Sequence, residues 1–121
     1  MENIDHLKKF WSKKKVFITG HTGFKGSWLC IMLNYLGSKI YGYALKPKKN
    51  ILFKKSKIIK NLISSNYSNI NDITKLKKIL KQTKPEIIFH LAAQPQVLES
   101  YSNPYDTIIT NIVGTTNILE L

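Results

Sequence analysis

The sequence contains no arginine, and all nineteen of its cationic residues are lysine. Guanidinium groups are the usual bidentate partners of phosphate and guanine, so their absence counts against sequence-specific recognition of nucleic acid. The formal charge of +12 leaves open a lysine-rich surface that binds polyanions through counterion release. Lysine, isoleucine and asparagine are abundant together, as AT-rich codons would produce, which favours solvated lysine faces over a nucleic-acid partner.

Cysteine and long apolar runs are also scarce. Cys30 is the only cysteine in 121 residues, so an internal disulfide is excluded and a reducing cytoplasm is the expected location. No run approaches the ~18 apolar residues of a membrane span, and the first residues, MENIDHLKKFW, are acidic where a signal peptide is basic. We therefore expect a single cytoplasmic domain over residues 1–121 with no membrane partner.

Apolar patterning predicts that strands and helices alternate along the chain. Strands are predicted at 15–19, 39–45, 62–67 and 86–93, and the last is an apolar run of the kind found in strands buried on both faces. Helices are predicted at 5–13, from about 22 to a stop at Gly37, irregularly within 46–61, after an N-cap at Asp72, and over 105–121. The segment QPQVLESYSNP between the last strand and the last helix is predicted to be a loop.

Three of these helices have a predicted apolar side. The apolar residues are Phe24, Trp28, Ile31, Met32 and Tyr35 in the first, Ile73, Leu76, Ile79 and Leu80 in the second, and Ile108, Ile109, Ile112, Val113, Ile118 and Leu119 in the third.

This alternation predicts a doubly wound α/β fold of the Rossmann type. Short connections between strands and helices imply parallel strands with right-handed crossovers. For four strands the expected order is 3-2-1-4, the N-terminal half of such a sheet.

The loop after the first strand carries glycines at spacing three, Gly20, Gly23 and Gly26. Glycine permits a tight turn and close approach of a ligand, and a helix N-terminus attracts anionic oxygens. A loop of this kind between a buried strand and a helix predicts a dinucleotide diphosphate site, although a tight turn without ligand remains the alternative. Lys25 is either solvated or near the anion, and His21 is either a turn residue or a cofactor contact.

Three segments resemble signatures of the extended short-chain dehydrogenase/reductases: TGHTGFKG at 19–26, FHLAAQP at 89–95 and NIVGT at 111–115. Within that family the sequence of the glycine loop, followed by YGYALKP and HLAAQPQV, is most similar to the CDP-glucose 4,6-dehydratases. The resemblance implies that NAD takes hydride from hexose C4, water leaves across C5 and C6, and hydride returns to C6.

The resemblance also implies a set of cofactor-binding residues. The glycines of the loop and its neighbours would surround the diphosphate and adenosine ribose, and later segments would line the rest of the cofactor. His90 is interpreted as a core histidine, and HLAAQP has the alternative of a buried strand that ends in small residues. The implied contacts are Gly20, His21, Thr22, Gly23, Phe24, Lys25, Gly26, Asn69, Ile70, Ala92, Ala93, Gln94 and Asn111.

The sequence departs from the family at three places. YGYAL at 41–45 has no acid for the ribose hydroxyls, so the preference for NAD over NADP rests mainly on the resemblance. Ser68-Asn69-Ile70 stands where the family commonly has Gly-Asp-Ile, which leaves a neutral group near adenine. The family's Tyr-x-x-x-Lys spacing occurs only at Tyr35 and Lys39. This pair lies at the end of the helix after the glycine loop, where the family has packing residues, so no catalytic residue is assigned.

The sequence therefore predicts the cofactor-binding portion of a nucleotide-sugar 4,6-dehydratase, without a substrate domain and inactive alone. A nucleotide-sugar substrate is expected only if a further part completes the fold, and a homo-oligomer is possible. Two alternatives remain: another member of the family, such as a nucleotide-sugar epimerase, or a lysine-rich polyanion-binding α/β module.

Overall fold

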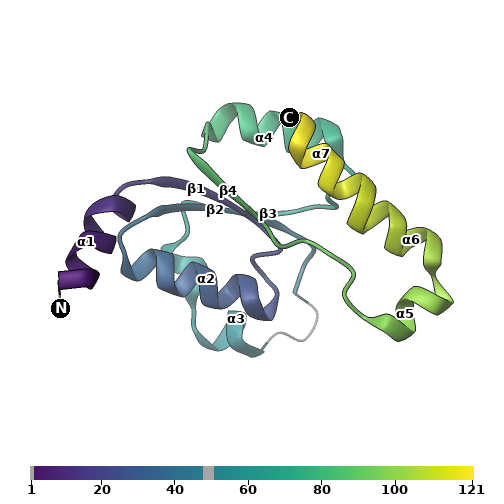
Figure 1. Cartoon of the computed structure of the whole chain (residues 1–121), viewed down its shortest axis with the longest axis horizontal. Helices are drawn as coiled ribbons and strands as arrows, with labels where there is room; N and C mark the ends of the chain where they lie inside the picture. The colour runs from purple at the N-terminus through teal and green to yellow at the C-terminus, as the bar shows by residue number, and fades with distance from the viewer. Residues whose placement is uncertain (1, 48–50) are drawn as a thin grey trace.

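A computed structural model describes residues 2–47 and 51–121 and shows four parallel strands in the order β3-β2-β1-β4. The strands are β1 (Lys15–Thr19), β2 (Lys39–Ala44), β3 (Ser64–Tyr67) and β4 (Ile87–His90). Helix α1 (Glu2–Trp11) precedes the sheet, while α2 (Phe24–Tyr35) and α3 (Ile51–Lys55) lie on one face and α4 (Ile73–Thr83) and α7 (Gly114–Glu120) on the other (Figure 1). The doubly wound fold and its strand order are therefore confirmed.

The strand register places the ends of β1, β2 and β4 at one edge. Thr19, the last residue of β1, pairs with Tyr43 of β2 and His90 of β4. Because parallel strands share a direction, their carboxyl ends open the crevice at which ligands bind in this class of fold.

Two clusters of buried apolar side chains sandwich the sheet. Val16 and Ile18 point to one face with Cys30, Leu33 and Phe53, and Phe17 points to the other with Tyr43 and three residues of α4. The α4 residues are Leu76, Ile79 and Leu80. Alternation along β1 thus supplies both cores from one strand.

The predicted end of α2 and start of α4 are confirmed. Gly37 follows the C-cap of α2 with a φ of 86°, a left-handed conformation that glycine adopts readily. Asp72 caps α4 by accepting a hydrogen bond from the backbone N–H of Lys75 at 3.1 Å. The irregular helix predicted within 46–61 is α3 followed by a 3₁₀ turn, η1 (Ile58–Asn61), and residues 48–50 of that segment lie outside the described residues.

The predicted apolar side of α2 is wrong. Phe24, Trp28, Met32 and Tyr35 are more than half exposed, and the helix instead buries Gly26, Ser27, Cys30 and Leu33 against the sheet. Because α2 is apolar on nearly every side, periodicity could not choose its buried face. Small residues at 26 and 27 let the helix approach the glycine loop, and that close approach sets the orientation.

The segment after β4 also differs from the prediction. The predicted loop contains α5 (Val97–Ser102), and the last helix runs through α6 (Pro104–Ile108), a π-helical turn η2 (Ile109–Val113) and α7. Gly114 and Asn117 are its buried residues, whereas most of the predicted apolar side, including Ile112 and Leu119, is exposed. Asn117 is anchored by donating to the Ile70 carbonyl, so a polar contact orients this helix.

Strand β4 is not buried on both faces as predicted. It pairs only with β1 among the described strands, and Ile88 is 37% exposed. Ile73 was predicted to lie on the apolar side of α4, but its side chain is 48% exposed, so this prediction is also wrong.

Among residues 2–47 and 51–121, no helix is long and apolar enough to cross a membrane.

Candidate functional site

The glycine loop joins β1 to α2 by a turn that other residues could not make. Gly20 has a φ of 74°, and a Cβ there would lie 2.8 Å from the backbone of Leu91 and Ala92. A Cβ on Gly26 would overlap the carbonyl oxygen of Gly20. The glycines at 20 and 26 therefore allow the loop to pack against the end of β4 and α2 to pack against the loop.

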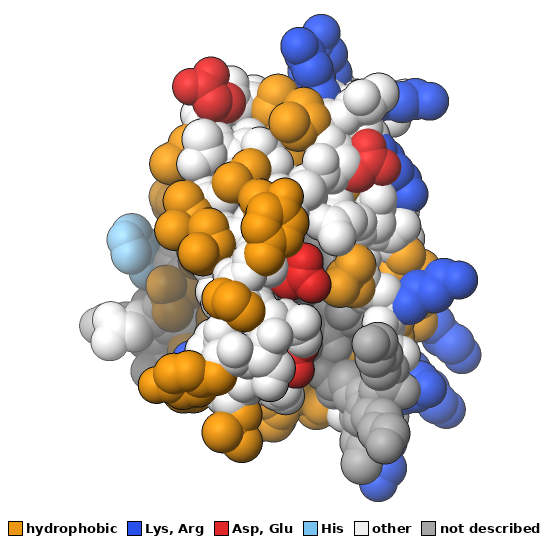
Figure 2. All heavy atoms as spheres, turned by 90° about the vertical axis from the view of Figure 1, so that its right-hand side faces the viewer, with side chains coloured by type: hydrophobic (Ala, Val, Ile, Leu, Met, Phe, Trp, Pro, Cys, Tyr) orange, Lys and Arg blue, Asp and Glu red, His pale blue; other side chains and the backbone are white. Residues whose placement is uncertain are grey.

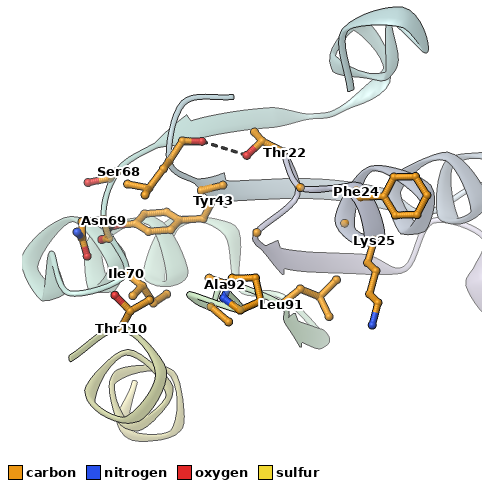
Figure 3. Close-up of a pocket in the computed structure, with 17 residues that line it drawn as sticks. Thr22, Phe24, Lys25, Tyr43, Ser68, Asn69, Ile70, Leu91, Ala92 and Thr110 are labelled. Carbon is orange, nitrogen blue, oxygen red and sulfur yellow. Dashed lines mark hydrogen bonds between the residues drawn. The ribbon is translucent and has the colours of Figure 1, made fainter. Parts of the chain in front are cut away.

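A cleft of about 680 Å³ opens at this edge of the sheet (Figure 3). It lies between the glycine loop, the ends of β2, β3 and β4, and Thr110 of η2. Ten predicted residues line it: Gly20, Thr22, Gly23, Phe24, Lys25, Gly26, Asn69, Ile70, Ala92 and Ala93. Its size falls within the usual range of small-molecule and cofactor sites.

The N-terminus of α2 faces the cleft, and no side chain in the described part of the chain is seen to cap it. Gly23 is the N-cap, it makes no side-chain cap hydrogen bond, and the first turn carries no acidic residue. Amides at a helix start, together with the helix dipole, bind anionic oxygens. Gly23 has room for a ligand because, among the residues that the structure describes, the only near neighbour of a Cβ at this position would be the Gly20 carbonyl oxygen, 3.3 Å away. These residues fit a dinucleotide diphosphate.

The ends of β2 and β3 form the opposite wall. The Tyr43 hydroxyl donates to the carbonyl of Asn69 at 2.9 Å, and the Thr22 hydroxyl donates to the carbonyl of Leu45 at 3.0 Å (Figure 3). Burial raises the pKa of Tyr43, so its hydroxyl keeps its proton and remains a donor. These bonds fix the backbone on which Asn69 and Leu45 face the cleft.

Thr19 positions the end of β4. Its hydroxyl oxygen accepts hydrogen bonds from the backbone N–H groups of Leu91 and Ala92, at 3.0 and 3.1 Å, and lies 2.7 Å from Nδ1 of His90. Because that oxygen already accepts two bonds, its own hydrogen donates to Nδ1, and His90 carries its proton on Nε2, 3.0 Å from Oγ1 of Thr115. Burial lowers the pKa of His90, in keeping with a neutral structural histidine.

His21 lies outside the lining of the cleft. Its ring is fully buried, stacked on Tyr67 at 6.3 Å between centroids and edge-on to Phe53 at 5.6 Å, with Nε2 2.7 Å from the Ser65 hydroxyl. Burial lowers its pKa to about 4, and the backbone of Tyr43 opposes part of that shift. A Cβ on Gly42 would overlap this ring. The position of His21 therefore favours its interpretation as a turn residue over that of a cofactor contact.

Gln94 and Asn111 also lie outside the lining, and they bind each other. The Asn111 side chain accepts from the Gln94 backbone N–H at 2.7 Å and donates to its carbonyl at 3.1 Å. This pair ties the chain after β4 to η2. Asn111 thus supports the wall that Ala92 and Ala93 form.

Several lining residues were missed by the sequence prediction: Tyr43, Ala44, Leu45, Ser68, Leu91, Pro95 and Thr110. Tyr43 and Leu45 lie at the end of a predicted strand beside the glycine loop, so the strand order could have indicated them. Thr110 reaches the cleft from a π-helical turn, which has no clear sequence signal.

Comparison with known proteins identifies the family. The family model described as GDP-mannose 4,6 dehydratase matches residues 17–121. The chain belongs to this family. It is 46% identical over 114 residues to the CDP-glucose 4,6-dehydratase of Salmonella typhimurium, covering 93% of this chain and 32% of that protein. It is 28% identical to the GDP-mannose 4,6-dehydratase of Vibrio cholerae, over 89% of this chain and 31% of that one.

Solved structures share the fold. A UDP-glucose 4-epimerase from Thermotoga maritima, solved with UDP-glucose, is 28% identical with a TM-score of 0.76, over 87% of this chain and 32% of that one. An epimerase from Stenotrophomonas maltophila, solved with bound NAD, is 22% identical with a TM-score of 0.73, over 88% of this chain and 32% of its own. The chain spans about a third of the length of these relatives. Its curated relatives include both dehydratases and epimerases, and the family model favours the dehydratases.

Proposed function

We propose that this chain is the cofactor-binding portion of a nucleotide-sugar 4,6-dehydratase, and that the cleft binds NAD. The whole enzyme would convert CDP-glucose to CDP-4-dehydro-6-deoxyglucose. The observation that carries the proposal is the uncapped N-terminus of α2 above a glycine loop in which Gly20 and Gly26 leave no room for a side chain. The 46% identity to a CDP-glucose 4,6-dehydratase supports the choice of substrate.

Each wall of the cleft has a role in holding the cofactor. The amides of Phe24 and Lys25, at the start of α2, would bind the diphosphate. Asn69 and Ile70 would lie against adenine, and Ala92 and Ala93 against the part of the cofactor beyond β4. NAD supplies hydride acceptance and return, while these residues bind and orient it.

Catalysis would need residues beyond those seen here. The chain has no Tyr-x-x-x-Lys pair in the helix position that the family uses, since Tyr35 and Lys39 lie at the end of α2 and the start of β2. We therefore expect the 121-residue chain to bind NAD and to leave CDP-glucose unchanged.

The test is a calorimetric titration of the purified chain with NAD, paired with an assay of CDP-glucose dehydration. Gly23→Val places a branched side chain where the diphosphate would approach, so we expect binding at least about fiftyfold weaker. Thr116→Val, on an exposed position of α7, is the matched control and should bind as the unaltered chain does. Failure of the unaltered chain to bind NAD at millimolar concentration, or equal binding by Gly23→Val, would contradict the proposal.

The polyanion-binding alternative predicts a different response. Lysine contacts with phosphate would weaken steeply with log salt concentration and would be unaffected by Gly23→Val. Among the described residues Lys25 is the only lysine that lines the cleft, so a polyanion site would lie elsewhere on the surface. Binding of heparin that survives Gly23→Val, with no binding of NAD, would favour this alternative.

A further inference from the structure

We propose that His21 is a positioning residue for the cofactor, whose ring holds the glycine loop in place from behind the cleft through its hydrogen bond to Ser65 of β3. This inference rests on the proposed function, because it concerns the loop that would bind the diphosphate. Residues that contact a ligand hold it well only when other side chains fix them from behind. His21 belongs to the loop but is absent from the described lining of the cleft.

The loop is bonded to the sheet at three consecutive residues. The backbone N–H of Gly20 and the hydroxyl of Thr22 donate to backbone carbonyls at the end of β2, at 2.9 and 3.0 Å. Between them in the sequence, Nε2 of His21 lies 2.7 Å from the hydroxyl oxygen of Ser65. This contact reaches past β2 to β3, the next strand of the sheet, so it ties the loop to a second strand.

The ring of His21 occupies a site formed by three elements. Phe53 of α3 lies edge-on to it, with 5.6 Å between the ring centroids, and Tyr67 of β3 stacks on it at 6.3 Å. On β2, a Cβ at Gly42 would overlap the ring. The side chain is fully buried, so it has little freedom to move while these elements remain packed.

One polar side-chain contact orients this ring. The other ring nitrogen, Nδ1, makes no hydrogen bond of ordinary geometry within residues 2–47 and 51–121. A buried polar atom without such a partner opposes folding, so packing alone would favour a phenyl ring at this position. What histidine adds over phenylalanine is therefore the bond to Ser65, which fixes the position of the loop.

The backbone of His21 transmits that position to α2. Its carbonyl accepts a hydrogen bond from the Ser27 hydroxyl at 3.3 Å, and the Ser27 backbone N–H donates to the Gly23 carbonyl at 2.8 Å. Ser27 is fully buried in the first turn of α2, next to the amides that would bind the diphosphate. Groups that recognise a ligand must be held within about 0.5 Å of their productive positions. Loss of the Ser65 bond would therefore weaken NAD binding without removing any group that touches NAD.

The test is a calorimetric titration of the 121-residue chain with NAD, using variants of Ser65, which lies outside the described lining of the cleft. Ser65→Ala removes the hydroxyl, and we expect binding about five- to tenfold weaker because the loop is less well held. Ser65→Thr keeps a hydroxyl at a strand position that suits β-branched residues, so binding should stay within about twofold. Ser64→Ala, on the opposite face of β3, is the matched control and should leave binding unchanged.

The outcomes separate this inference from the proposed function. If the unaltered chain binds NAD and Ser65→Ala binds it equally well, the inference is wrong and the proposed function stands. If the unaltered chain does not bind NAD, both are wrong. Urea denaturation of each variant gives its folded fraction, and a loss of affinity that only matches a loss of folded protein would also overturn the inference.

A double-mutant cycle tests whether Ser65 acts through His21. His21→Phe keeps a buried ring but cannot bond to Ser65, so we expect NAD binding about tenfold weaker in a chain that remains folded. Adding Ser65→Ala to His21→Phe should change binding by less than about twofold, because the bond is already lost. Full additivity of the two losses would show that the residues act separately and would overturn the inference.

Discussion

Residues 1–84 and residues 85–121 differ in both charge and burial. All nineteen lysines lie in the first region, whereas the second has no lysine and four acidic residues. Every buried apolar side chain that the structure describes lies between Val16 and Leu80. The two regions therefore present surfaces of different charge.

The second region exposes large apolar side chains. Figure 2 views the molecule from the side of α5 and α6 and shows apolar side chains across its centre, with most lysines along one edge. We call this the C-terminal apolar surface, and it consists of Val97, Leu98, Tyr101, Tyr105, Ile108 and Ile112, which are between 52% and 82% exposed. Contiguous apolar surfaces of this kind mark sites of association. The first region thus carries the core, and the second carries a group of exposed large apolar side chains.

The largest expected effect comes from one substitution made in each region. Leu76 on α4 is fully buried, and Leu98 on α5 is 82% exposed. Leu76→Ala should lower the free energy of unfolding by about 2–5 kcal/mol through lost burial and a cavity. Leu98→Ala is the matched control and should change it by less than about 0.5 kcal/mol. Urea denaturation followed by circular dichroism measures both, and equal losses would contradict the comparison.

The sequence predicted the first region better than the second. β1 was predicted at its exact bounds, and the strand order followed from alternating elements and the handedness of crossovers. The buried face of α2 could not be predicted, because the helix is apolar on nearly every side and packs through Gly26 and Ser27. The face of α7 is set by Gly114 and by Asn117, whose bond to the Ile70 carbonyl joins residues distant in sequence.

Within the site, the outcome depended on the kind of sequence signal and not on the region. Gly20, Gly23 and Gly26 were predicted from local spacing, because the loop contains both the turn and the helix start. His21, Gln94 and Asn111 were predicted by resemblance, but the structure places them behind the lining. Their positions depend on side-chain partners, Ser65 for His21 and the mutual pair of Gln94 and Asn111. Such partners are determined by the tertiary structure and carry no local signal.

A second difference between the two regions concerns how stability depends on pH. The pKa of buried His21 is lowered to about 4, whereas an unfolded histidine titrates near 6.5. Between these values the unfolded chain binds a proton that the folded chain does not, so acid favours unfolding. The contribution of neutral His21 to the free energy of unfolding should be fully present above about pH 6.5. It should fall by about 3 kcal/mol as the pH drops to 4. Urea midpoints measured at intervals from pH 7.5 to 4.5 would follow this loss.

His21→Phe provides the matched variant for that measurement. It keeps a ring between Phe53 and Tyr67 but cannot titrate, so stability should depend less steeply on pH. His90 in the second region is only partly buried, and its lowered pKa leaves a smaller residual slope in the same direction. Repeating the series in 0.5 M NaCl screens repulsion among the lysines but leaves desolvation of the ring unchanged. Identical slopes for the two proteins would show that His21 is not the titrating group.

A final expected effect concerns association of the chain with a second copy. Burial of a large apolar side chain in a contact between copies contributes about 1.5–3 kcal/mol to the free energy of association. If copies associate through the C-terminal apolar surface, the double variant Leu98→Lys with Tyr105→Lys should weaken self-association by about a hundredfold or more. Sedimentation velocity should show the unaltered chain growing in size with concentration, while the double variant stays at the monomer mass of 13.9 kDa.

Two added lysines also raise the net charge, so the effect of charge must be separated from that of the surface. Asn61→Lys with Gln82→Lys adds the same two charges at exposed positions of the first region. Because these positions lie outside the C-terminal apolar surface, we expect this control to associate nearly as strongly as the unaltered chain. Loss of association in both double variants would assign the effect to net charge. An unaltered chain that remains monomeric at high concentration would show that the second region is exposed without serving as a contact between copies.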